Sequence, residues 1–464
     1  MEKPDGKIEI HVYKRRWLYL LVAVLQQFNQ MAYFLTYATV ADATDAFYGR
    51  NTTNILSAVF MLFALLATLP AMWICQRYGL APVLYFGNMV MAVGLSIRLC
   101  SNIGSLDQTG RFWLVVVGHA ISAITNPFTM MLPPKVSSVW FPDNQRALCT
   151  SIVSIAGPVG IMAMGVMAPA VDGPDAQDKI PLLNWLAWAP TIAAALLCAV
   201  VVRENQPPKP PSTSSGLDDT TPFWTGLWRC CTSVPFLILF VAVGGGVGLF
   251  NTLYVMMEQL LCVHAYSDTF AGLCLVIMII GGLFGATITG LIADKTGYLN
   301  ELLKLSFPLV IATLGAISVC CMYADLQWLI GAMCFLFGFF GLASYAISFE
   351  VAVECTYPVN ETTSSGLIGF SGQLFGLIMV LIFGFLSRPL NVDETQHEIC
   401  TIGGAVQPMD MIVPMLVLTS FGVVTTAVAL PGFRPDYKRR RVERQLAISK
   451  ALQMQSSDED SIRM

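Results

Sequence analysis

Polar side chains recur at helical spacing inside stretches of the chain that are otherwise apolar. In the first of these stretches four polar residues fall three or four positions apart and so share one face of a helix: Gln26, Gln30, Tyr33 and Tyr37. Polar groups in an apolar environment are costly unless they face a cavity or a partner. We therefore expect this face to point into the protein, where its groups could contact a bound solute.

Two later apolar stretches repeat the pattern with different chemistry. Each carries three polar residues on one face: His119, Ser122 and Asn126 in one, and Asn251, Tyr254 and Glu258 in the other. Amides and phenols of this kind can orient a polar solute. They can also serve only as hydrogen-bonded contacts between helices, and for Gln26 and Ser122 this is the interpretation we favour.

The composition is that of a membrane protein. Hydrophobic residues make up 55% of the 464 residues and charged residues 12%, with a mean hydropathy of +0.64, whereas a soluble domain has roughly 25% charged residues. About twelve apolar runs are long enough to cross the bilayer as helices. The net charge of −4 gives no indication of a nucleic-acid partner.

The apolar runs group into two sets of six, separated by a segment rich in Pro, Ser and Thr. We expect a cytoplasmic N-terminus over 1–16, a six-helix half over 17–203, a linker over 204–222, a second six-helix half over 223–432 and a tail over 433–464. Most basic residues, including Lys438 to Arg441, then fall on one side, so both termini are predicted to be cytoplasmic. Asn51-Thr52-Thr53 would lie outside, which makes Asn51 a predicted glycosylation site.

A short loop between two apolar runs carries a gating signature. It reads Gly290-Leu291-Ile292-Ala293-Asp294-Lys295-Thr296-Gly297, and a degenerate copy ends the second run at Gly79. The loop resembles the G-x-x-x-D-x-x-G signature of the major facilitator superfamily. Its glycines permit close approach of helix ends, and Asp294 is suited to cap a neighbouring helix. The resemblance implies two related six-helix halves and a gating role for Gly290, Asp294 and Gly297.

Longer segments resemble the feline leukaemia virus subgroup C receptor-related family, solute carrier family 49. These segments are Leu132 to Ala147, Tyr37 to Asp42, Glu354 to Val359 and Ser364 to Gly366. Within the family, the chain is most similar to the orphan branch called major facilitator superfamily domain-containing protein 7. Arg146 lies in the first segment, where it could serve in gating or, with Lys135 and Trp140, in anchoring at the membrane interface.

The resemblance also implies a solute site. Choline-transporting members of the family hold a cation with an aromatic residue, a Tyr and two Gln residues, and the matching positions here are Phe34, Asn251, Pro158 and Gln373. Gly79 and Gly297 close the two copies of the loop and so occupy equivalent positions in the two halves. When the same offset is added to the position of Phe34, the equivalent position in the second half lies beside Asn251. An aromatic ring attracts a cation without hydrogen bonds, so Phe34 is the predicted π face. Tyr33, Tyr37, Asn126 and Tyr254 complete the predicted substrate-binding set.

We expect a multi-pass secondary-type transporter that moves a small organic solute by alternating access. A choline-like or ethanolamine-like cation is favoured over haem, because His119 is the single His within a predicted helix and haem needs an axial ligand. The alternative is a receptor or sensor with a transporter fold and no net transport. No enzymatic constellation appears, and no cofactor is expected. We expect a monomer in the plasma membrane whose partners are its solute and membrane lipids. Cys262 and Cys400 could form a disulfide.

Overall fold

Every long element in the described part of the chain is a helix. The computed structural model describes residues 11–142, 145–171, 176–209, 211, 222–262, 266–323, 325–356, 358–389 and 409–433. Within these ranges twelve helical spans are long and apolar enough to cross a membrane. The all-α membrane fold class that the apolar runs predict is therefore confirmed.

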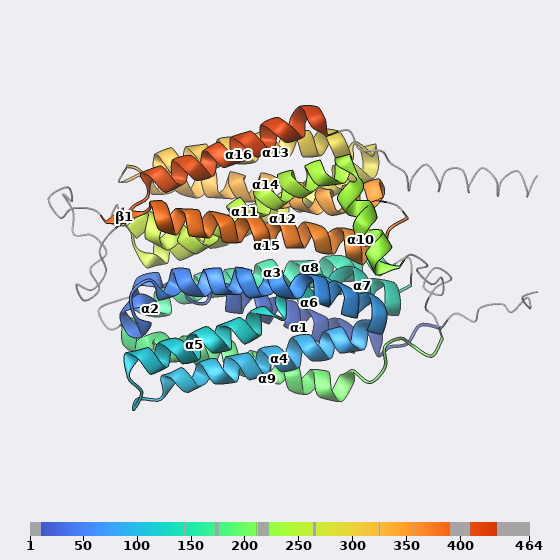
Figure 1. The fold of residues 1–464 in the computed structure, drawn as a ribbon, viewed down its shortest axis with the longest axis horizontal. Helices are drawn as coiled ribbons and strands as arrows, with labels where there is room; N and C mark the ends of the chain where they lie inside the picture. Colours follow the sequence, from blue (N-terminus) through green and yellow to red (C-terminus); the bar gives the residue numbers. More distant parts are fainter. Residues whose placement is uncertain are drawn as a thin grey trace, which may run out of the picture.

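The helices form two bundles that lie side by side (Figure 1). The first contains α1 (Arg16–Leu35), α2 (Ala41–Tyr48), α3 (Thr52–Tyr78), α4 (Leu80–Leu99), η1 (Cys100–Asn102), α5 (Gln108–Ala123), α6 (Asn126–Met130), α7 (Leu132–Trp140), α8 (Arg146–Val171), η3 (Ala176–Lys179) and α9 (Ile180–Val201). The second contains α10 (Phe223–Thr232), α11 (Val234–Cys262), α12 (Asp268–Thr296), α13 (Leu299–Cys320), α14 (Gln327–Thr356), α15 (Glu361–Leu386) and α16 (Ile412–Gly432), with the short antiparallel pair β1 (Arg388–Pro389) and β2 (Met409–Asp410).

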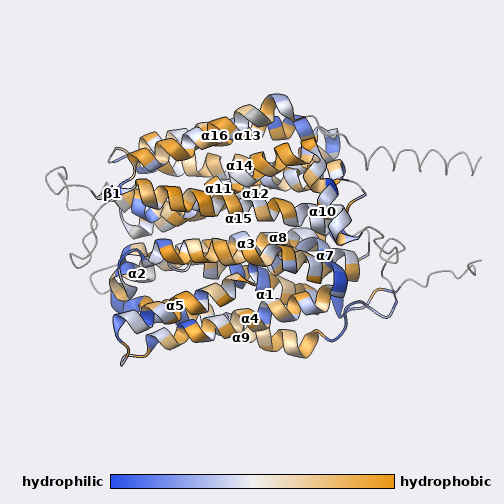
Figure 2. Cartoon of the chain, in the orientation of Figure 1, coloured by the Kyte–Doolittle hydropathy of each residue, from blue (hydrophilic) through white to orange (hydrophobic). Residues whose placement is uncertain are grey.

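The bundle has two distinct ends. We call the end that holds α7 and α10 the linker end, and the end that holds α2 and β1 the α2 end (Figure 1). Hydrophilic residues gather at both ends, and the middle of each long helix is mostly hydrophobic (Figure 2). This distribution fits a protein whose middle lies in hydrocarbon and whose ends lie in water.

Glycines end two of the long helices at the linker end. Gly297 follows α12 with φ +72° and donates its N–H to the carbonyl of Ala293 at 2.8 Å. Gly79 follows α3 with φ +86°. A left-handed residue after a helix favours glycine because a Cβ is disfavoured there. The loop predicted over Gly290–Gly297 is therefore wrong in its extent, because residues up to Thr296 continue α12 and the helix ends at Gly297. The side chain of Asp294 lies outside the described part of the structure.

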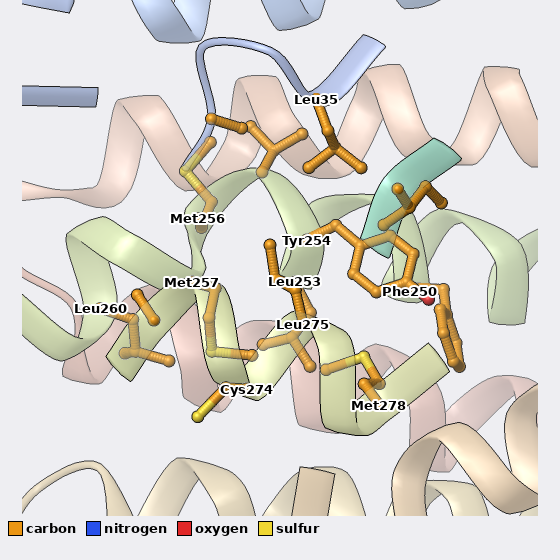
Figure 3. Packing of buried hydrophobic residues seen from close by; sticks show 14 of the residues in the cluster. Leu35, Phe250, Leu253, Tyr254, Met256, Met257, Leu260, Cys274, Leu275 and Met278 are labelled. Carbon is orange, nitrogen blue, oxygen red and sulfur yellow. The ribbon is translucent and has the colours of Figure 1, made fainter. Parts of the chain in front are cut away.

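The two halves are tied together at the α2 end. Helix α8 packs against α12, and α3 packs against α15. The backbone N–H of Asp42 donates to Oε1 of Glu258 at 3.4 Å, and Nε2 of Gln259 donates to Oδ1 of Asn54 at 3.1 Å. Figure 3 shows the apolar cluster at this end, in which Leu35 of the first half packs with α11 of the second.

Two short helices and one side chain differ from the sequence-based picture. Neither α2 nor α10 was expected, because each is too short to cross a membrane. The indole of Trp140 faces the protein and not lipid; it is buried and stacks on Tyr19, with ring centroids 4.0 Å apart. Packing of α7 against α1 therefore decides the position of this indole.

Candidate functional site

A large cavity lies between the two halves. Its volume is about 1170 Å³, which is above the usual 300–1000 Å³ range of small-molecule sites. The cavity runs from Phe34 and Tyr254 toward Leu299 and Ser365 at the linker end. It thus extends toward the end opposite to the contacts that tie the halves together.

An aromatic pair forms the first-half wall of the cavity. Phe34 of α1 is 7% exposed, and its ring lies 4.4 Å from that of Phe60 on α3, with the two planes inclined by 32°. Both rings line the cavity. They present π faces that can hold a cation, as predicted for Phe34 from the resemblance.

A break in one membrane span supplies an amide beside this pair. Helix α5 ends at Ala123, and α6 begins at Asn126 with Pro127 in its first turn. The hydroxyl of Thr125 donates to Oε1 of Gln30 at 2.7 Å and so fixes the break against α1. Asn126 is buried and lines the cavity, and neither of its amide atoms has a hydrogen-bond partner among the described residues. Irregular backbone at membrane depth is tolerated where it lines a cavity, so this amide is placed to meet a solute.

Glycines in α11 bring the second-half polar groups together. A Cβ on Gly248 would lie 2.8 Å from the backbone N of Gly376, so α11 and α15 approach closely there. This contact places Asn251 of α11 and Gln373 of α15 on the same wall of the cavity. Tyr254 lines the cavity one turn after Asn251, and its hydroxyl has no partner within the described ranges.

One acidic side chain and no basic one occur among the described lining residues. The acidic residue is Glu354, which is 8% exposed near the linker end of α14. The remaining polar lining comes from amides and hydroxyls. A cation that enters from the linker end would therefore meet a carboxylate and would meet no opposing positive charge in the lining.

Tyr33 and Tyr37, two of the predicted solute contacts, do not line the cavity. The Tyr33 hydroxyl donates to the carbonyl of His119 at 2.5 Å, and the Tyr37 hydroxyl donates to Oδ1 of Asn184 at 2.6 Å. The guanidinium of Arg98 lies 4.0 Å from the centre of the Tyr37 ring. Both tyrosines thus belong to a buried polar cluster inside the first half.

Sequence reasoning missed two kinds of residue. Phe60 and Gln27 line the cavity, but a Phe in an apolar run carries no signal, and Gln27 lies beside the predicted stripe. Arg98 is fully buried and donates from Nε to Oδ1 of Asn184 at 2.9 Å. An arginine inside an apolar run is the signal that could have revealed this cluster.

The predicted gating residues lie at the linker end. Gly290 lines the cavity, and Gly297 ends α12. Arg146 donates from Nε to the carbonyl of Phe141 and from a terminal nitrogen to that of Ser138, both at 3.4 Å. Arg146 therefore helps to close the carboxyl end of α7.

Asn51, the predicted glycosylation site, is exposed at the α2 end. Its backbone has φ +62°, and its N–H donates to Asp45 at 2.8 Å. The Asp45 carboxyl also accepts from the N–H and hydroxyl of Thr53. Burial raises the pKa of Asp45, and these hydrogen bonds oppose that rise. The Cys400 residue and the side chain of Cys262 lie outside the described part.

Comparison with known proteins places this architecture in a family. The model of the Major Facilitator Superfamily matches residues 19–380. Solute carrier family 49 member A3 of Xenopus tropicalis is 30% identical over 94% of this chain and 91% of that protein. The chain belongs to solute carrier family 49 of the major facilitator superfamily. The resemblance read from the sequence segments is thereby confirmed.

Other relatives agree with this membership. An uncharacterised Caenorhabditis elegans protein, B0416.5, is 33% identical over 99% of this chain and 91% of that protein. The human choline/ethanolamine transporter FLVCR2 is 27% identical over 82% of this chain and 74% of that protein. A D-xylose-proton symporter structure has a TM-score of 0.69 at 12% identity, covering 91% of this chain and 98% of that one. This likeness concerns the fold.

Proposed function

We propose that this protein is a secondary-type transporter of a small organic cation of the choline or ethanolamine kind. The observation that supports the proposal is the cavity between the halves, whose described lining combines aromatic rings, amides and one acidic side chain with no basic one. An organic cation needs these features: π faces for its charge, amides for its polar arm and a carboxylate for attraction. Relatives that are named choline/ethanolamine transporters support the same substrate class.

Haem is a weaker candidate for this cavity. His119 is buried beside Tyr33 and Phe60, with ring centroids 4.6 and 6.1 Å away, and it does not line the cavity. The described lining contains no His or Cys, and the residues in it that could ligate haem iron are Met31, Met130, Met131, Tyr254 and Tyr345. Methionine or phenol ligation without a histidine or a thiolate is less common, so the lining favours a small cation.

Transport would proceed by alternating access. The described state is tied at the α2 end and hollow toward the linker end. The distribution of Lys and Arg supports a cytoplasmic linker end, so this state would be the inward-facing one. In the opposite state the contacts of Glu258 and Gln259 with the first half would break, and the linker ends of α8 and α12 would close. We assign this cycle to the plasma membrane and to a monomer.

Uptake by purified protein in liposomes tests the proposal. Radiolabelled choline and ethanolamine should accumulate beyond protein-free vesicles, and each unlabelled compound should compete for uptake of the other. Binding measured on the same preparation separates a transporter from a receptor. Binding without uptake would favour the receptor alternative, and neither binding nor uptake of any organic cation would contradict the proposed substrate class.

A further inference from the structure

Helix α10 is amphipathic but too short to span a membrane. Phe223, Gly226 and Cys230 are buried, and α10 packs on α11 and α15. Its other face carries Trp224 and Trp228, which are 68% and 71% exposed. Because these indoles lie four positions apart, they project from one side of the helix. Figure 1 places α10 at the linker end, beside α15.

The position of α10 along the bundle matches the edge of the bilayer. One residue separates α10 from α11, whose outward side begins with the exposed apolar residues Val234 and Leu237. These residues mark where the lipid-facing surface of the second half starts. Trp224 and Trp228 lie just beyond that start, at the depth where indoles are enriched because one side is apolar and the other is wet.

A small cavity lies directly beside this helix. It has a volume of about 520 Å³ between the α10–α11 connection and the turn that joins α14 to α15. Its lining comprises Arg229, Thr232, Ser233, Val234, Pro235, Cys355, Thr356 and Pro358. Arg229 is the cation of this lining, and its guanidinium has no ion-pair or hydrogen-bond partner among the described residues.

We propose that this cavity binds the headgroup of an anionic phospholipid. Arg229 pairs with the phosphate, the Ser233 hydroxyl donates to it, and Trp224 and Trp228 lie in the adjoining interfacial layer. The bound lipid would join the start of α11 to the turn before α15. It would thereby hold the linker end of the second half at the membrane surface while the two halves move.

A bilayer lipid fits the site better than a soluble anion or an acidic peptide. Either of those could satisfy Arg229, but neither would continue from the cavity onto the apolar outer surface of α11. A lipid satisfies the guanidinium with its phosphate while its chains lie along the apolar surface that begins at Val234. Val234 at the rim of the cavity continues directly into the lipid-facing surface of α11.

Native mass spectrometry of the purified full chain tests the headgroup contact. The protein is titrated with phosphatidylglycerol in detergent that contains excess phosphatidylcholine. Arg229→Gln should weaken binding of the tightest phosphatidylglycerol about fivefold, the effect of one basic residue near an anionic membrane surface. The matched control is Arg203→Gln, because Arg203 is exposed at the same end and lines neither cavity.

Equal phosphatidylglycerol affinity of wild type and Arg229→Gln would overturn the proposal, and so would an equal loss in Arg203→Gln. Full displacement of the lipid by millimolar inorganic phosphate would identify a soluble-anion site instead. The indoles are tested with phosphatidylcholine brominated near the carbonyl end of its chains. Replacing Trp224 and Trp228 together by Phe should lower the fraction of the tryptophan fluorescence that the bromines quench, and an unchanged fraction would contradict an interfacial α10.

Discussion

Replacement of Phe34 is the most direct probe of the cavity. The ring is almost enclosed and packs against Phe60 at 4.4 Å, so a cation held on its free face would be largely stripped of water. A cation–π contact is worth about 0.5–2 kcal/mol, and desolvation moves it toward the upper value. Loss of the ring should therefore weaken the apparent affinity for the solute by roughly 2- to 30-fold.

The choice of replacement at Phe34 separates the effect of the aromatic ring from the effect of side-chain volume. Phe34→Ala removes both, and truncation of a buried Phe costs about 3–5 kcal/mol of stability. Phe34→Leu keeps most of the volume and loses the π face, so it should lower affinity with little loss of folded protein. Phe34→Trp offers a stronger π face and should preserve or improve affinity if the wider ring fits.

The assay is concentration-dependent uptake in liposomes, normalised to folded protein. Phe86→Leu is the matched control, since Phe86 packs on Phe128 with centroids 4.5 Å apart and lies outside the cavity lining. Normal affinity in Phe34→Leu together with a loss in Asn251→Ala or Gln373→Ala would refute the cation–π reasoning and indicate a neutral or anionic solute. Normal transport by every one of these variants would mean that the site lies elsewhere.

Three further predictions concern the frame around the cavity. Asn184→Ala should lower stability by roughly 2 kcal/mol because Tyr37 and Arg98 lose their acceptor, and an unchanged unfolding midpoint would argue against it. Asp294→Ala should reduce uptake and favour opening at the linker end, since a helix-capping charge is worth about 0.3–2 kcal/mol. Labelling of cysteines at that end should then rise. Unaltered labelling and uptake would count against a capping role. Burial raises the pKa of Asp45, so the stability that its protonated form contributes is lost as the pH rises above 3.8. We therefore expect the melting temperature of wild type to fall relative to that of Asp45→Asn as the pH is raised above 3.8. A difference between the two that does not change with pH would contradict the raised pKa of Asp45.

The sequence by itself determined the membrane architecture. A helix that crosses hydrocarbon must satisfy its own backbone and present about 20 apolar residues, so each span is written into its local composition. The glycine that ends α12 is equally local, because Gly297 adopts a left-handed conformation that other residues avoid. Membership of solute carrier family 49 could likewise be read from short segments of the chain.

The tertiary structure decided which polar groups face the cavity. Periodicity put Tyr33 and Tyr37 on one stripe, yet their hydroxyls bond to His119 and Asn184 inside the first half, while the neighbouring Phe34 reaches the cavity. The rotation of a helix about its axis is set by the helices packed around it, and no local pattern encodes that packing. For the same reason the cavity beside α10 could not be predicted from the sequence. The indoles of α10 can be found in the sequence, but the cavity at Arg229 forms only because the α14–α15 turn, more than a hundred residues later, packs beside α10.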